Sequence, residues 1–376
     1  LVDFTGTSGN LKIETGAIKI ATGAAAGSIV SVTDTAGVAL DVISASMGQS
    51  SLNLTTTQNA GTTGADGTVN ILGNITSLQQ INITTNGDAG PNNINVGGTV
   101  GGGNTQGVVN LTSNGGSVTT SGAGLIQSLQ STINATQGIN IKTQIGNTGP
   151  GIGPGLAANS SAGNVNINQQ GAVSFSVGGT AQAGGTFTAT AQNTLNARNI
   201  NVAGGNINLS TTGGNGIVML GPVTTGNTSG SVTLTTTGGS NITQAVGATQ
   251  AITSNNITLN SAGSIGTSTG SVLTNAVNNG TVTAISSATG NVYLSDSATG
   301  NVTINAPTTS TGTLSLVSQA AQLNVPNANY SNVSIINNNG GGNVLLNSGN
   351  IMSAVLGNGS GAFAVTAGGN IDANQN

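Results

Sequence analysis

The sequence predicts an all-β protein, a parallel β-helix or β-solenoid of roughly 12–19 coils. Three observations support this fold class. A short alternating pattern recurs along the chain, glycine makes up 62 of the 376 residues, and only 3% of the residues are charged. A typical soluble domain contains about 25% charged residues, so ordinary surface helices are not expected.

The recurring pattern is a glycine, then Asn, Ser or Thr, then an aliphatic–polar–aliphatic run. It is seen at residues 163–167 (GNVNI), 205–209 (GNINL) and 230–234 (GSVTL). Alternation with a period of two and β-branched residues on one face is typical of half-buried strands. Glycine and asparagine tolerate positive φ, so they mark the corners between strands.

The spacing of these strands favours a solenoid over a propeller or barrel. The pentapeptide ATGNV begins at Ala288 and again at Ala298, and each copy leads into a short alternating strand. Two or three such steps give a coil of about 20–30 residues, with coils ~4.8 Å apart. Propeller blades use longer hairpins with aromatic marks, whereas this chain has only four Phe and two Tyr. We expect aliphatic side chains to stack inside, and Asn and Thr to form hydrogen-bonded ladders outside or at the corners.

Three segments depart from the repeat. Residues 1–50 hold half of the charged residues and are interpreted as capping or junction coils, or as drift within one array, whereas residues 51–376 are predicted to be the solenoid repeat array. The segment from Gly146 to Gly163 contains two of the six prolines and does not alternate, which predicts a side loop. The segment from Leu125 to Gln130 (LIQSLQ) is the one candidate for a short helical turn.

Composition excludes several classes of site. Without Cys there is no disulfide and no thiolate metal site, and without His the usual neutral-pH acid–base group is missing. A net charge of −4 with only four basic residues offers no footprint for nucleic acid or anionic lipid. No run of 18 apolar residues exists, so no insertion into a membrane is expected. Because the chain begins at Leu1, we expect either a removed leader or a piece of a longer protein.

Catalytic carboxylates are not expected. Enzymes built on β-helices need clustered carboxylates in one groove. Asp34 and Asp41 are the candidate pair in the N-terminal half, at an undetermined separation. Between Arg198 and Ile371 the only ionisable acid, apart from two Tyr, is Asp296. The acidic residues are therefore interpreted as solvated corner residues, and the chain as a protein that is not an enzyme, with no catalytic, cofactor-binding or metal-binding residues.

Weaker motifs receive structural interpretations. Calcium could bind at Asp66 or Asp88, but the repeated Gly-Gly-x-Gly-x-Asp pattern of calcium β-rolls is absent. The stretch from Gly97 to Gly107 lacks the following helix that a phosphate site needs, so its glycines are assigned to corners. Thr-x-Thr pairs occur irregularly, which predicts outward-facing threonines and no continuous flat array. Asn-x-Ser/Thr acceptors for glycosylation follow from composition, for example at Asn208, Asn256 and Asn301.

The segments SNNITLNSAGSIG (Ser254–Gly266) and SAGSIGTSTGSVL (Ser261–Leu273) resemble the repeats of filamentous-haemagglutinin-type exoproteins of bacterial two-partner secretion, and autotransporter passengers are similar. The segment GGNINLS (Gly204–Ser210) has the same style, and the resemblance covers most of residues 50–376. It implies a right-handed parallel β-helix, secreted across an outer membrane, that acts in adhesion or as a surface fibre. The N-terminal secretion domain of that family has no clear match here.

These observations lead to one expected function and two alternatives. We expect a secreted or cell-surface bacterial structural or adhesive β-solenoid that self-associates into extracellular filaments, with cell-surface glycans or proteins as further partners. The first alternative is a carbohydrate-active enzyme on the same fold, which carboxylates meeting in one groove would favour. The second is a functional amyloid, in which neighbouring strands belong to different chains.

Overall fold

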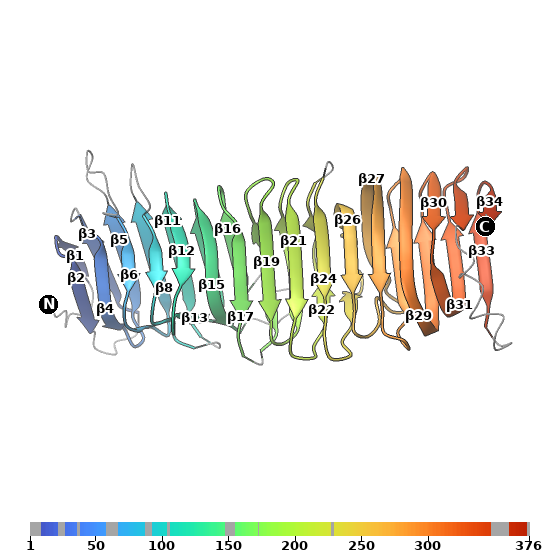
Figure 1. Ribbon diagram of the computed structural model, residues 1–376. Helices are drawn as coiled ribbons and strands as arrows, with labels where there is room; N and C mark the ends of the chain where they lie inside the picture. Colours follow the sequence, from blue (N-terminus) through green and yellow to red (C-terminus); the bar gives the residue numbers. More distant parts are fainter. Residues whose placement is uncertain are drawn as a thin grey trace. The chain divides into compact units, whose positions relative to one another are not determined.

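A computed structural model of the chain describes residues 9–21, 27–35, 38–57, 67–86, 92–103, 106–146, 155–171, 173–226, 229–346 and 361–373. These residues form parallel strands stacked as a β-solenoid, and none of them lies in a helix (Figure 1). The chain divides into two compact units, Leu1–Gln182 and Ala183–Asn376. Together the units contain about 14 turns, which confirms the predicted fold class and number of coils; the right-handed sense stays a prediction.

Among its described residues, the first unit contains eighteen short strands. They are β1 (Gly9–Ile13), β2 (Ala17–Ala21), β3 (Ile29–Asp34), β4 (Leu40–Ser46), β5 (Ser51–Thr57), β6 (Val69–Ile71), β7 (Ile75–Thr76), β8 (Gln80–Asn86), β9 (Ile94–Val96), β10 (Thr99–Val100), β11 (Val108–Asn114), β12 (Ser117–Thr120), β13 (Leu125–Ser128), β14 (Gln130–Ala135), β15 (Gly138–Ile145), β16 (Leu156–Ser160), β17 (Val165–Gln169) and β18 (Phe175–Thr180).

The described part of the second unit contains sixteen strands, some of which run through a corner. They are β19 (Thr186–Ala191), β20 (Leu195–Asn201), β21 (Asn206–Thr211), β22 (Ile217–Met219), β23 (Val223–Thr224), β24 (Ser231–Thr235), β25 (Ile242–Gln244), β26 (Ile252–Asn260), β27 (Val272–Ile285), β28 (Val292–Asp296), β29 (Asn301–Ser318), β30 (Gln322–Val325), β31 (Ala328–Asn337), β32 (Asn343–Leu346), β33 (Phe363–Ala367) and β34 (Ile371–Ala373).

Each turn has three sides. In the first unit β5, β6 and β7 are followed by β8, β9 and β10, and then by β11, β12 and β13. The pairs β5–β8–β11, β6–β9–β12 and β7–β10–β13 are all parallel. Turn length varies because the corners differ: Ser31 and Asn53 are 22 residues apart on adjacent turns, whereas Asn53 and Asn82 are 29 apart. The strands stay in register because the extra residues are taken up at the corners.

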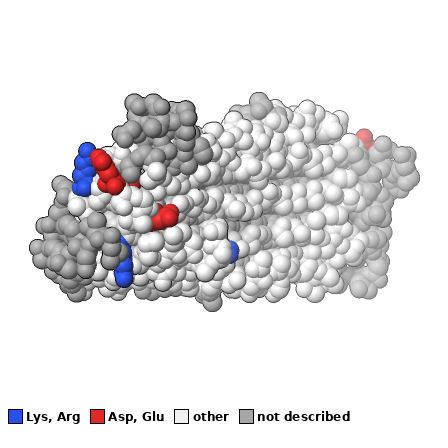
Figure 2. Space-filling view, turned by 60° about the vertical axis from the view of Figure 1, so that its left-hand side comes forward, with Lys and Arg blue, Asp and Glu red and all other residues white. Residues whose placement is uncertain are grey.

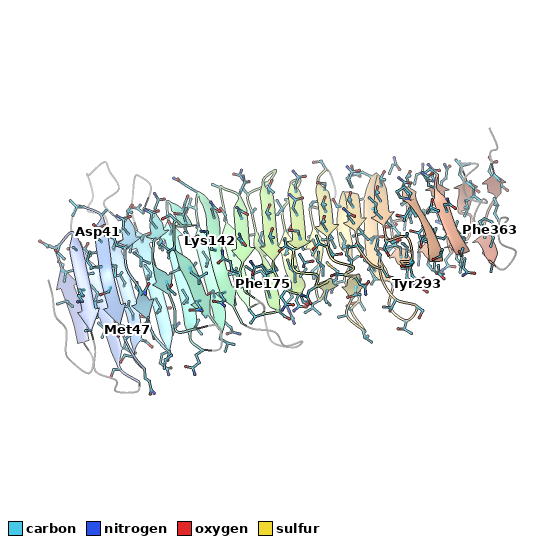
Figure 3. All side chains as sticks on the ribbon, turned by 60° about the horizontal axis from the view of Figure 1, so that its bottom comes forward. Asp41, Met47, Lys142, Phe175, Tyr293 and Phe363 are labelled. Atoms are coloured by element: carbon cyan, nitrogen blue, oxygen red, sulfur yellow. The ribbon has the colours of Figure 1, made fainter. Side chains whose placement is uncertain are left out.

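The core is a stack of aliphatic side chains facing inward. Along β5, Leu52 and Leu54 are buried while Asn53 between them is half-buried, and β24 repeats this alternation in the second unit. Side chains stand on both sides of the strands in Figure 3. Each fully buried Val, Leu or Ile contributes about 1.5–3 kcal/mol. Since one turn buries only a few of them, stability comes from stacking on the neighbouring turns.

Inward-facing hydroxyl groups donate hydrogen bonds to backbone carbonyl groups at the corners. In the first unit Thr85 Oγ1 donates to the Asn92 carbonyl at 2.6 Å, and Thr56 donates to the carbonyl of Gly67. In the second unit Thr236 Oγ1 donates to the Ser240 carbonyl at 2.7 Å, and Ser310 Oγ donates to that of Gly290 at 2.8 Å. A buried carbonyl without a partner costs free energy, so a Ser or Thr at the inward end of the strand stabilises the turn.

One sequence prediction is wrong, and another is wrong in part. Leu125–Ser128 is strand β13, not a helical turn, because Ile126 and Ser128 alternate inward and the strand pairs with β10 and β15. The predicted loop over 146–163 contains β16, which pairs with β14 because Leu156 and Ala158 fill the core. Residues 147–154 of that loop lie outside the described residues. Within residues 1–50, β1–β4 pair in the same parallel manner as later strands.

Candidate functional site

The outer faces carry asparagine ladders, as the sequence predicts. On the face formed by β5, β8 and β11, Asn82 Nδ2 donates to Asn53 Oδ1 at 2.7 Å, and Asn110 Nδ2 donates to Asn82 Oδ1 at 2.9 Å. In each bond the donor belongs to the later turn and the acceptor to the earlier one. The ladder therefore has a direction along the solenoid, and its bonds polarise one another.

A second ladder follows β4, β6, β9 and β12 and begins at a carboxylate. Asn70 Nδ2 donates to Asp41 Oδ1 at 2.9 Å, Asn95 Nδ2 donates to Asn70 Oδ1 at 2.9 Å, and Thr119 Oγ1 donates to Asn95 Oδ1 at 3.1 Å. The donors again come from the later turn. Asp41, labelled in Figure 3, is thus the acceptor at the N-terminal end of this ladder.

The second unit presents a regular array of hydroxyl and amide groups. We call it the unit-2 hydroxyl array: the outward residues of β19, β21, β24, the second half of β26 and the second half of β27. In-register pairing places its middle column in the order Thr188, Asn208, Thr233, Thr258 and Thr283. A flanking column holds Thr190, Ser210, Thr235 and Asn260.

The Thr-x-Thr pairs do not themselves stack on consecutive turns, because Asn206 and Asn208 of β21 lie between Thr186–Thr190 and Thr233–Thr235. Their spacing in the sequence is irregular, but the pairs at Thr186–Thr190, Thr233–Thr235 and Thr281–Thr283 fall on strands that stack in register. The predicted outward orientation is confirmed, since these threonines are half-buried and alternate with fully buried residues.

The middle column has open hydrogen-bonding capacity. In the flanking column Thr190 and Ser210 bond to each other at 2.9 Å. Among the described residues, no side-chain hydrogen bond to another protein group is made by the middle column, Thr188, Asn208, Thr233, Thr258 and Thr283. The array contains no charged residue. It therefore offers neutral donors and acceptors at regular intervals.

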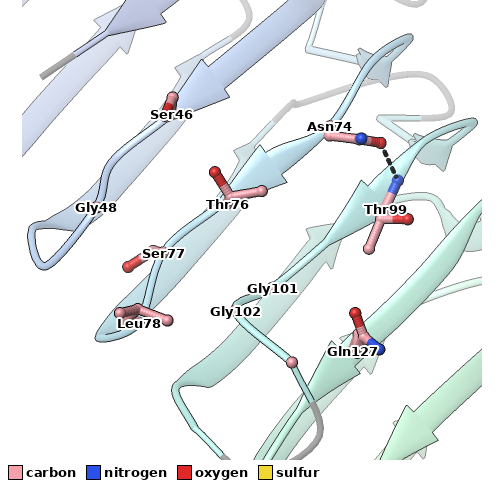
Figure 4. Close-up of a pocket in the computed structure, with 11 residues that line it drawn as sticks. Ser46, Gly48, Asn74, Thr76, Ser77, Leu78, Thr99, Gly101, Gly102 and Gln127 are labelled. Atoms are coloured by element: carbon pink, nitrogen blue, oxygen red, sulfur yellow. Dashed lines mark hydrogen bonds between the residues drawn. The ribbon is translucent and has the colours of Figure 1, made fainter.

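A polar notch lies on another face of the first unit (Figure 4). Its volume is about 440 Å³, and it is lined by residues of β4, β7, β10 and β13 and of the adjoining turns, including Thr76, Thr99, Gln127 and Leu78. Asn74 Oδ1 accepts a hydrogen bond from Thr99 N at 2.9 Å across it.

The notch is lined by glycines whose missing side chains let neighbouring backbones approach closely. A Cβ on Gly101 would lie 1.6 Å from the carbonyl oxygen of Gln127, and one on Gly102 would lie 2.1 Å from that of Ser77. Gly101 also has a φ of +132°, which L side chains rarely adopt. The close approach of neighbouring backbones thus requires glycine here. This confirms the corner role assigned to the glycines of Gly97–Gly107. The notch is therefore a consequence of how the backbones of neighbouring turns pack.

The structure does not bring Asp34 and Asp41 together. Asp34 faces inward at the end of β3 and is 1% exposed, in register with Ile13 and Thr56. Asp41 faces outward on β4, in register with Ala17 and Asn70. The interpretation of the acids as solvated corner residues is wrong for Asp34, because inward alternation buries it. Among the described residues, no three His, Cys, Asp or Glu side chains form a group able to hold a metal ion.

Asp296 is likewise buried, and reasoning from the sequence missed it. It ends β28 after Val292 and Leu294 and shares their inward direction, so it is 0% exposed. Its Oδ2 accepts hydrogen bonds from Thr274 Oγ1 at 2.8 Å and Ala276 N at 3.1 Å, and its Oδ1 accepts one from Ala298 N at 3.0 Å. The alternation itself is the signal that places this carboxyl inside.

Burial raises the pKa of the Asp296 carboxyl above its ordinary value of 3.8, although the three hydrogen bonds lower it. In the first unit Gln169 occupies a similar place. Its Oε1 accepts from Thr143 Oγ1 at 2.7 Å and from Ile145 N at 3.1 Å. The same two-donor arrangement is thus built once with a neutral amide and once with a carboxyl group, which indicates a structural role for both.

The remaining sequence candidates show no further site. Asp66 and Asp88 lie outside the described residues. Asn208, Asn256 and Asn301 are exposed, as a glycosylation acceptor must be, but nothing more distinguishes them. Figure 2 shows one face with few charged side chains, so most of its described surface is neutral. No helix among the described residues is long and apolar enough to cross a membrane.

Comparison with protein-family models, curated proteins and solved structures finds no match to this chain. The fold and the chemistry of its outer faces therefore carry the functional argument. The parallel solenoid is consistent with β-helix repeat proteins in general.

Proposed function

We propose that this protein is a secreted or cell-surface structural and adhesive β-solenoid of bacterial origin, which extends an extracellular fibre by contacts between copies of the chain. The resemblance of its repeats to filamentous-haemagglutinin-type exoproteins and autotransporter passengers supports this proposal. So does the chemistry of its surface, which is nearly uncharged and repeats from turn to turn.

The direction of the asparagine ladders carries the proposal. Donors lie on the later turn and acceptors on the earlier turn in the bonds Asn82–Asn53, Asn110–Asn82 and Asn95–Asn70. A second copy stacked head to tail would repeat this order in the same sense along the assembly. Such a heterologous contact does not close on itself and generates an open filament.

The last described turn offers a surface for this contact. Val344 on β32 is fully buried, but its in-register partner Ile371 on β34 is 50% exposed. In the described registers β33 pairs with β31, and β34 pairs with β32. Unpaired strand edges with exposed apolar side chains favour the addition of another strand.

Electron microscopy of the purified chain over a concentration series tests the proposal. We expect filaments that lengthen with concentration, and we expect Ile371→Lys to shorten them because it places a charge on the exposed edge. The matched control is Leu72→Lys, at a side chain that is 57% exposed in the first unit. A chain that stays monodisperse at high concentration, or equal shortening by both substitutions, would contradict end-to-end assembly.

A further inference from the structure

We infer that the unit-2 hydroxyl array binds a neutral, hydroxyl-rich polysaccharide presented as long chains. The inference rests on the adhesive role proposed above and names both the surface and the chemical class of its ligand. It is argued from the in-register columns of β19, β21, β24, β26 and β27.

The chemistry of the array fits a ligand that both donates and accepts hydrogen bonds. Threonine hydroxyls and asparagine amides have both capacities, and the middle column from Thr188 to Thr283 spends none of its side-chain capacity on other described protein groups. Sugar hydroxyl groups have the same dual capacity. The threonine methyl groups beside each hydroxyl supply small apolar contacts for the C–H faces of sugar rings.

The absence of charge from the array narrows the ligand class. All its outward positions are Thr, Asn or Ser except Ile285 at one end. A sulfated or carboxylated polysaccharide would meet no opposite charge here, and neither would a nucleic acid. Binding should therefore be nearly independent of ionic strength.

The spacing of the array favours long polysaccharide chains over single sugars. Adjacent turns repeat about every 4.8 Å, and outward residues along one strand repeat about every 6.6 Å. A single sugar meets only a few neutral groups of the array, whose outward residues include no aromatic side chain, so its binding is weak. A long chain contacts several turns at once, and each further contact acts at high effective concentration. Affinity should rise steeply with the number of sugar residues.

Retention of the full chain on insoluble cellulose, a neutral polysaccharide, tests the inference, with heparin-coated beads as the anionic comparison. We expect retention on cellulose that is unchanged between low and high salt and is not competed by glucose or cellobiose. Thr233→Val with Thr258→Val should reduce retention at least tenfold, because two adjacent hydroxyls of the middle column are lost while the β-branched shape remains.

The matched control is Thr243→Val with Thr253→Val. These residues are half-buried and face outward in the same unit, but on β25 and the first half of β26. Circular dichroism should show the same fold for all variants. No retention on cellulose, equal loss from both double variants, or salt-sensitive retention on heparin alone would overturn the inference. Filament formation is scored separately by microscopy, so failure of glycan binding is distinguishable from failure of fibre assembly.

Discussion

The carboxyl group of Asp296 is an ionisable group buried in the solenoid interior. It is held by one hydroxyl and two backbone N–H groups, and it lies in register with Thr274 on the preceding turn. Three neutral donors favour the ionised form, but burial opposes it more strongly and raises the pKa. The interior thus contains a proton-binding group in a chain with few ionisable residues.

Stability should therefore fall as the pH rises from about 4 toward neutrality. Because the pKa is higher in the folded state, the folded chain binds more protons than the unfolded chain in this range, and the stabilising effect is lost once the pH passes the folded pKa. Each unit by which the pKa is raised corresponds to about 1.4 kcal/mol. Asp296→Asn should flatten this part of the profile, as measured by urea unfolding at several pH values.

Ser295→Asn is the control for this experiment, since Ser295 faces outward on the same strand and its substitution removes no carboxyl group, so the slope should stay unchanged. If the free energy of unfolding differs between wild type and Asp296→Asn by the same amount at about pH 4 and pH 8, the raised pKa is contradicted.

Strands join into turns through side-chain ladders as well as through the backbone. Asn82 is the central member of one ladder, since it donates to Asn53 and accepts from Asn110. Asn82→Asp removes the donor and places a carboxylate against the Asn53 carbonyl oxygen. We expect the free energy of unfolding to fall by about 1–3 kcal/mol, as for other unsatisfied polar groups.

Asn168 on β17 provides the comparison within the same unit, because it is exposed and makes no ladder bond to any described residue. Chemical denaturation of Asn168→Asp should show a change within about 0.5 kcal/mol, as for most surface substitutions. Equal effects at the two positions would show that the Asn53–Asn82–Asn110 ladder contributes nothing to stability.

Alternation predicted most strands, but it could not predict how they pair. Runs such as VNI at β6 and SVTLT at β24 alternate visibly. The alternation of LAANS at β16 was missed because this strand follows a stretch with two prolines, which favours a loop. Pairing depends on the length of each corner, which varies between turns. For this reason the sequence analysis missed the columns of the unit-2 hydroxyl array.

At the scale of the whole chain, two compact units each hold their own stack of turns. Since a solenoid turn is stabilised by its nearest neighbours, each unit should keep its fold when produced alone. We expect fragments 1–182 and 183–376 to show β-type circular dichroism and cooperative unfolding. Limited proteolysis of each fragment checks the result, and a fragment degraded at the rate of an unfolded chain would contradict it.

The sequence by itself determined the class of this protein: alternating aliphatic residues, corner glycines and scarce charges leave a stacked parallel solenoid as the structure able to bury its core. It also determined that Asn and Thr would line the outside, because alternation assigns each residue to one face. Only the tertiary structure decided which residues share a column, such as Thr233 with Thr258. A column depends on register, register depends on where each corner closes, and corner lengths leave no periodic signal in the chain.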